Sequence, residues 1–181
     1  DSSEVVMQCG QSIVGVDPRS GNEKWVIEEG RDTISSATPA GGYLLVPGDD
    51  LMALDIAASA TAPEIAWRKN RVSPSNASPV AGKDRFYALK GSVLIAADTN
   101  DGNILWQQRL SGVRNSWATP VTAGNRIYLF DQAGIGLVLE DSGESAEVVS
   151  EVELGEPVLG SPAIVGGRLI VRGADTLYCF D

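Results

Sequence analysis

The apolar positions of this chain fall into pairs of short runs separated by polar turns. In residues 86–98, the runs Phe86-Tyr87-Ala88-Leu89 and Val93-Leu94-Ile95-Ala96 are parted by Lys90-Gly91-Ser92. Apolar, β-branched or aromatic runs joined by such a turn are typical of a β-hairpin. Five blocks of thirteen residues share this pattern and end in an acidic residue: residues 5–17, 43–55, 86–98, 128–140 and 169–181.

A second pattern recurs between these blocks. A hydroxyl residue followed by proline occurs four times, as Thr38-Pro39, Ser78-Pro79, Thr119-Pro120 and Ser161-Pro162. These prolines are 40, 41 and 42 residues apart. A nearly constant period of about forty residues indicates supersecondary units that stack on one another.

Each repeat is predicted to contain four antiparallel strands. One strand is expected at the Ser/Thr-Pro, two in the hairpin block, and a fourth at Trp25, Trp67 or Trp106, with Val148 in the corresponding place of the fourth repeat. Four strands in about 41 residues is the size of a β-propeller blade. An all-β sandwich is the alternative, but its strands need not recur in register.

A more specific signature joins the hairpin to the tryptophan. It reads Ala96-x-Asp98-x-x-x-Gly102-x-x-x-Trp106 in the third block and Gly15-x-Asp17-x-x-x-Gly21-x-x-x-Trp25 in the first. This signature resembles the repeat of the pyrroloquinoline-quinone-type (PQQ-like) β-propellers, found in quinoprotein dehydrogenases and in the outer-membrane lipoprotein that assists the β-barrel insertase. The resemblance covers essentially the whole chain.

The resemblance implies that each tryptophan docks between neighbouring blades, on the small residue and the glycine of the signature. A flat indole needs a neighbour without a bulky side chain if it is to lie flush. Two copies depart from the signature: residues 55–67 contain extra residues and no glycine, and residues 140–148 have lost the tryptophan and moved the glycine to Gly143. We expect looser blade junctions at these two places.

The strand count predicts an arc and not a closed ring. Four first strands, five hairpins and four tryptophan-type strands give eighteen strands, whereas a closed four-bladed ring needs sixteen. An arc of five blades, in which the first lacks its innermost strand and the last its outermost, uses every strand. We therefore expect residues 1–181 to form a single PQQ-like domain that starts and ends within a blade of a larger propeller. Its two open faces should meet the missing blades or a second copy.

Composition narrows the possible partners. The chain has 24 acidic and 14 basic residues and a net charge of −10, which repels nucleic-acid phosphate and anionic lipid. No apolar run approaches the roughly eighteen residues that a transmembrane helix needs, and no signal peptide precedes Asp1. We expect protein partners, no nucleic acid and no membrane insertion. The family resemblance favours a periplasmic or extracellular location.

Candidate chemistry is sparse. The chain has no histidine, which removes the commonest general base, so we expect no catalytic residues. Residues 98–102 resemble a calcium loop, but the glycine comes one place early and Arg109 stands where the last ligand belongs. Cys9 and Cys179 occupy small-residue slots and should be buried; a disulfide between them is the alternative. We predict no metal site.

No cofactor is expected either. The quinoprotein enzymes that the repeat resembles hold their quinone with adjacent cysteines, a stacking tryptophan, calcium and a catalytic aspartate. This chain has no adjacent cysteines and no haem-attachment motif, and Trp117 is its one candidate stacking residue, interpreted more simply as a core or rim aromatic. The sequence favours a non-catalytic propeller that serves as an interaction scaffold in envelope assembly or sensing. The alternative is a fragment of a quinoprotein dehydrogenase.

Overall fold

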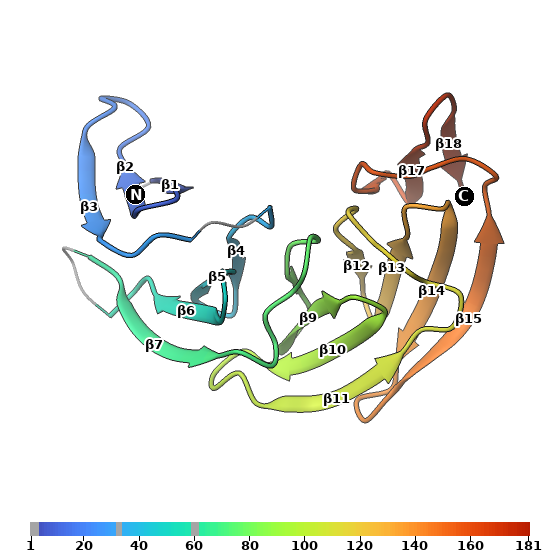
Figure 1. Ribbon diagram of the computed structural model, residues 1–181, viewed down its shortest axis with the longest axis horizontal. Coiled ribbons are helices and arrows are strands. Elements are labelled where there is room, and N and C mark those ends of the chain that lie inside the picture. The colour runs from blue at the N-terminus through green and yellow to red at the C-terminus, as the bar shows by residue number, and fades with distance from the viewer. Residues whose placement is uncertain (1–3, 32–33, 59–61) are drawn as a thin grey trace.

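Every regular element in the described part of the chain is a β-strand. The computed structural model describes residues 4–31, 34–58 and 62–181, and these form five consecutive antiparallel sheets. The sheets follow one another along a curved array whose two ends carry the chain termini (Figure 1). The predicted all-β architecture of repeated antiparallel sheets is confirmed.

The three middle sheets have four strands each, and the first and last have three among the described residues. The first sheet contains β1 (Val5–Gln8), β2 (Ile13–Val16) and β3 (Glu23–Ile27). The second contains β4 (Thr38–Ala40), β5 (Tyr43–Val46), β6 (Leu51–Asp55) and β7 (Glu64–Lys69). The third contains β8 (Val80–Ala81), β9 (Arg85–Lys90), β10 (Val93–Asp98) and β11 (Ile104–Arg109). The fourth contains β12 (Val121–Ala123), β13 (Arg126–Phe130), β14 (Ile135–Asp141) and β15 (Ala146–Glu153). The last contains β16 (Ala163–Val165), β17 (Arg168–Arg172) and β18 (Leu177–Phe180).

The hairpins form where the apolar runs predict them. In the third sheet Val93 pairs with Lys90 and Asp98 with Arg85, so the two runs face each other across a two-residue turn. Gly91 in that turn has φ +61°, which glycine adopts without steric cost. In the first four sheets, the strand after the hairpin pairs with its second strand across a β-bulge, which lies between Ala96 and Ala97 in the third sheet.

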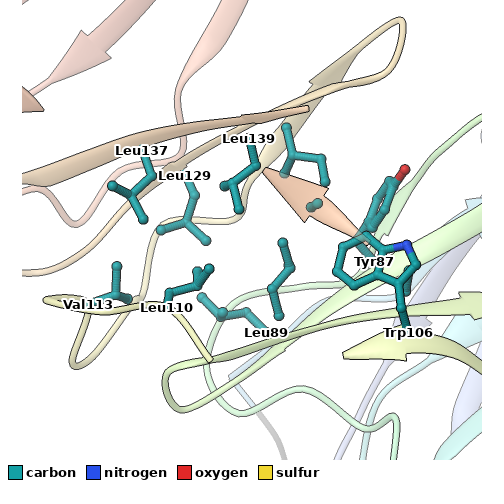
Figure 2. Packing of buried hydrophobic residues seen from close by; sticks show 12 residues of the cluster. Tyr87, Leu89, Trp106, Leu110, Val113, Leu129, Leu137 and Leu139 are labelled. Atoms are coloured by element: carbon teal, nitrogen blue, oxygen red, sulfur yellow. The ribbon is translucent and has the colours of Figure 1, made fainter. Parts of the chain in front are cut away.

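Each junction between neighbouring sheets has its own hydrophobic cluster. The largest cluster joins the third and fourth sheets, where Leu89, Leu94 and Trp106 pack against Leu129 and Leu139 (Figure 2). Burying side chains of this size stabilises by about 1.5–3 kcal/mol each. Because each sheet packs only on the sheet or sheets next to it, the array is held together by its junctions and not by one common core.

Hydrogen bonds from the Ser/Thr-Pro segments link the inner strands of successive sheets. The backbone amide of Ser78 donates to Thr119 Oγ1 at 3.0 Å, and the amide of Thr119 donates to Ser161 Oγ at 3.0 Å. One repeat earlier, the amide of Ser36 donates to Ser78 Oγ at 2.8 Å. The repeated hydroxyl thus serves as the acceptor that joins one blade to the blade before it.

Candidate interaction surfaces

The tryptophan of a repeat contacts residues of the following repeat as well as residues of its own. Trp67 stacks on Phe86 of the following sheet with ring centroids 5.9 Å apart, and its Nε1 donates to the carbonyl oxygen of Thr99 at 3.0 Å. A Cβ added to Gly102 would lie 2.8 Å from the indole. Gly102 therefore accommodates the ring of Trp67, which precedes it by one repeat.

The fourth repeat carries serine in the tryptophan slot. In the third sheet Trp106 pairs with Ala96, immediately before the bulge. The corresponding pair in the fourth sheet is Val138 with Ser150, whereas Val148 lies beyond the bulge, opposite Leu139. The assignment of Val148 to this slot is wrong, because Leu139 pairs with Val148, nine residues later, whereas Ala97 pairs with Ile104, seven residues later, so the fourth repeat has two extra residues before the slot.

A groove lies beside Ser150, at the junction of the fourth and last sheets. It has a volume of about 730 Å³, and its lining includes Tyr128, Phe130 and Val138 of the fourth sheet and Leu169 and Phe180 of the last. Two features leave it open. Ser150 is small where other repeats carry an indole, and β18 has no outer neighbour among the described strands.

A buried polar cluster connects the outer parts of the third and fourth sheets. Asp141 accepts hydrogen bonds from the Tyr87 hydroxyl at 2.6 Å and from Trp106 Nε1 at 3.2 Å, and Arg85 lies 3.3 Å from the same carboxylate. Burial, and then the hydrogen bond to Asp141, raise the pKa of Tyr87 far above its usual value. Several donors from one sheet thus converge on one carboxylate of the next and link the two sheets.

A second charged network joins the first two sheets. The Arg31 guanidinium, whose side chain is 4% exposed, contacts Glu29 at 2.7 Å and Asp50 at 2.5 Å, and Arg68 also pairs with Glu29. The Arg68 guanidinium lowers the pKa of Glu29, opposed in part by burial. Breaking a buried pair by removing one partner costs about 3–5 kcal/mol, so this network stabilises the junction only while it is complete.

The first sheet has an uncovered apolar face. Residues opposite one another in a sheet share a face, and the register places Met7 beside Val14 and Val26, and Val5 beside Val16. Val5 is 49% and Met7 46% exposed. The other face, with Ile13 and Trp25, packs on the second sheet. An uncovered patch of this kind marks an interaction surface.

The last sheet has the matching face at the other end of the array. Leu169, Tyr178 and Phe180 pack toward the fourth sheet, which leaves Ile170, Cys179 and Leu177 on the opposite face, and Leu177 is 66% exposed. Cys179 was expected to be buried, and this prediction is wrong. Its counterpart Ala96 is covered by the following sheet, and among the described residues no sheet follows β18.

The remaining sequence candidates lie in turns or exposed on the surface. Cys9 is exposed in the turn after β1, so its expected burial is wrong too, and both thiols are free. Asp98 accepts a hydrogen bond from the amide of Asn100 at 2.8 Å, and Asp101 one from the amide of Asn103 at 2.8 Å. These carboxylates shape the turn before β11, as Asp and Asn commonly do. Trp117 is 41% exposed, so it is a rim aromatic and not a core residue.

Metal ligands and membrane-spanning helices are absent from the residues that the structure describes. Within them, no group of three or more Cys, Asp or Glu side chains is placed to hold a metal ion. The same residues contain no helix long and apolar enough to cross a membrane. The absence of cofactor and metal sites stays a prediction.

Repeated antiparallel blades, joined by tryptophan junctions, define a β-propeller of PQQ-like repeats. The family described as outer membrane protein assembly factor BamB matches residues 10–145 and 90–181, and the chain belongs to this family. The outer membrane protein assembly factor BamB of Salmonella typhimurium is 30% identical over 107 residues, which are 59% of this chain and 26% of that protein.

Solved structures show the same fold. The crystal structure of BamB from Moraxella catarrhalis matches with a TM-score of 0.75 and 19% identity, over 99% of this chain and 54% of that one. Kluyveromyces lactis Hsv2 matches with a TM-score of 0.70 and 12% identity, over 96% of this chain and 62% of that one. The chain thus spans about a quarter of the curated relative and about half of the bacterial structure.

Proposed function

We propose that this chain is an arc of a larger, non-catalytic β-propeller that serves as a protein–protein interaction scaffold in the assembly of the bacterial outer membrane. The observation that carries this proposal is the family match over residues 10–181, together with a curated relative named for that role. A scaffold needs rigid, chemically varied surfaces, and the charged groups of Asp141 and Arg31 are engaged with partners inside the protein.

The two uncovered faces fit an arc. Val5 and Met7 at one end and Val165 and Leu177 at the other are between 46% and 66% exposed. Further blades of the same polypeptide are the simplest cover for both, and a second copy of the chain is the alternative. The assembly role also implies an extracytoplasmic location.

A fragment of a quinoprotein dehydrogenase is the competing function. It would require pyrroloquinoline quinone, and the chain offers neither adjacent cysteines nor a histidine. Repeat and cofactor are separable, since the repeat determines the fold while binding depends on particular side chains.

Site-specific photo-cross-linking tests the proposal. A photoreactive residue is placed at exposed Ala174, in a hairpin turn, and at exposed Glu144, in a turn on the opposite rim, and the protein is expressed in the periplasm of Salmonella typhimurium. We expect one rim to cross-link to a protein of the outer-membrane assembly machinery. No protein cross-link from either rim, combined with stoichiometric, calcium-dependent quinone binding in vitro, would contradict the proposal and favour the dehydrogenase.

A further inference from the structure

The outermost strands of the blades are β3, β7, β11 and β15. Their outer edges are free and lie along the convex outer side of the array (Figure 1). An edge strand presents unpaired backbone donors and acceptors on which another strand can form. β15 has 8 residues, whereas the other three have 5 or 6. It therefore offers the longest of these edges.

Three of the four edges carry basic side chains of the kind that discourage strand addition. Lys24 on β3 pairs with Glu4 at 3.2 Å, Lys69 on β7 donates to Asn103 at 3.0 Å, and Arg109 on β11 donates to Ser92 at 2.9 Å. β15 carries no lysine or arginine. Instead it exposes two consecutive valines, Val148 at 40% and Val149 at 47%.

The charged side chains on β15 are all acidic. Residues 127–167 contain eight acidic residues and no lysine or arginine. Glu147, Glu151 and Glu153 are exposed on β15, and none of the three forms an ion pair within the described residues. Glu147 also lies directly opposite Glu140 on β14, and Glu140 already pairs with Arg126 at 3.6 Å, so the Arg126 guanidinium leaves Glu147 itself without an ion pair.

We propose that the outer edge of β15 is a docking site for an extended, basic segment of a partner protein, which pairs with β15 as an additional strand. Main-chain hydrogen bonds along the edge supply affinity, and the glutamates select lysine or arginine side chains. The inference rests on the proposed scaffold function and names the surface and the kind of partner.

Charge complementarity singles out this occupant. A second copy that paired through its own β15 would place glutamates against glutamates, and nucleic acid would be repelled by the same carboxylates. A basic strand instead neutralises Glu151 and Glu153, which share one face of β15 because they are two residues apart.

The test uses a fluorescently labelled nine-residue peptide of alternating lysine and valine. Binding to the purified chain is followed by fluorescence anisotropy, and amide hydrogen exchange with mass spectrometry locates it. We expect saturable binding with slower exchange in residues 146–153. A matched peptide with N-methylated valines keeps its charge but loses backbone donors, and we expect it to bind at least tenfold more weakly.

The protein variants distinguish peptide binding at the β15 edge from a general effect of net charge on affinity. Glu151→Lys with Glu153→Lys should weaken peptide binding at least tenfold. Glu28→Lys with Glu64→Lys makes the same change in net charge at exposed positions elsewhere, and should alter affinity by less than threefold. Unchanged denaturation midpoints establish that both pairs of variants are folded.

Several results would overturn the inference: equal affinity for the N-methylated peptide, equal weakening by the two variant pairs, protection at β3, β7 or β11, or a dimer without peptide that Glu151→Lys with Glu153→Lys dissociates. Failure here, alongside partner cross-links from a rim, would leave the scaffold function intact. Peptide binding at β15, with no cross-link in cells and with calcium-dependent quinone binding, would contradict the scaffold function alone.

Discussion

The backbone amide of Ser78 donates a hydrogen bond to Oγ1 of Thr119, 41 residues later, at 3.0 Å. The bond gives a physical reason for the most regular feature of the sequence. The hydroxyls of Ser78, Thr119 and Ser161 each accept from the preceding blade, and the proline that follows fixes the backbone next to them. The bond from Thr119 to Ser161 repeats the arrangement.

Replacing Thr119 with valine should therefore loosen one blade junction. The variant keeps the shape of the side chain but leaves the amide of Ser78 without its acceptor, which should lower the free energy of unfolding by about 1–2 kcal/mol. Denaturant titration measures the loss, and Ser111→Ala at an exposed loop position is the control. Equal effects of the two substitutions would show that the repeated hydroxyl has no linking role.

The contact of Gly102 with Trp67 predicts a large cost for a single methyl group. Gly102 has φ +68°, and an added Cβ would lie 2.8 Å from the indole, so Gly102→Ala should destabilise by about 2–4 kcal/mol. Gly91 has φ +61° with no atom within 4 Å of an added Cβ, so Gly91→Ala should cost about 1 kcal/mol from the backbone alone. Similar losses at both positions in chemical denaturation would contradict the packing of Trp67 on Gly102.

The register of β15 predicts that a tryptophan stabilises the protein at position 150 and not at position 148. Ser150→Trp should place an indole in the groove against Leu169 and Phe180 and raise the free energy of unfolding by about 1–2 kcal/mol. Val148→Trp should give no gain, because Val148 lies beyond the bulge, opposite Leu139. Thermal and denaturant unfolding of both variants checks this. A gain for Val148→Trp alone would restore the assignment made from the sequence.

Tyr87 should make stability fall at high pH. Its pKa is raised in the folded state by burial and by Asp141, so the unfolded chain releases this proton first, near its ordinary value of 10.0. The contribution is complete below that pH and is lost as the pH rises above it. Tyr87→Phe should cost about 1–2 kcal/mol at pH 7 and less at pH 11. Tyr43→Phe, whose hydroxyl has no partner among the described residues, is the control; a cost independent of pH for Tyr87→Phe would contradict this account.

Much of the fold could be predicted from the sequence because its signals are local and recur. The turn at Lys90-Gly91-Ser92 specifies a hairpin, and the Asp98-to-Trp106 signature specifies the connection from that hairpin to the outer strand. The repeat period indicates that these units form successive sheets. The hairpins, the sheet order and the incomplete outer sheets followed from these features.

The features that could not be predicted are mainly contacts between residues of neighbouring repeats. The sequence alone does not reveal that Gly102 contacts the tryptophan of the preceding blade, or that a longer β14–β15 hairpin places Ser150 in the slot assigned to Val148. The buried cluster on Asp141 was also missed, because its members are about 35 to 56 residues apart. The burial of Cys179 was predicted by analogy with Ala96, which has a following sheet to cover it.

If this chain is an arc of repeats, its last sheet should accept one more strand of the same kind. Asp181 corresponds to Asp98, so a copy of residues 99–110 is attached directly after Asp181, in a Cys9→Ser background that leaves Cys179 as the only thiol. The copied tryptophan should pair opposite Cys179, as Trp106 does with Ala96. We predict at least tenfold slower reaction of the Cys179 thiol with a disulfide reagent than in the unextended chain. A thiol that reacts at an unchanged rate would contradict the account.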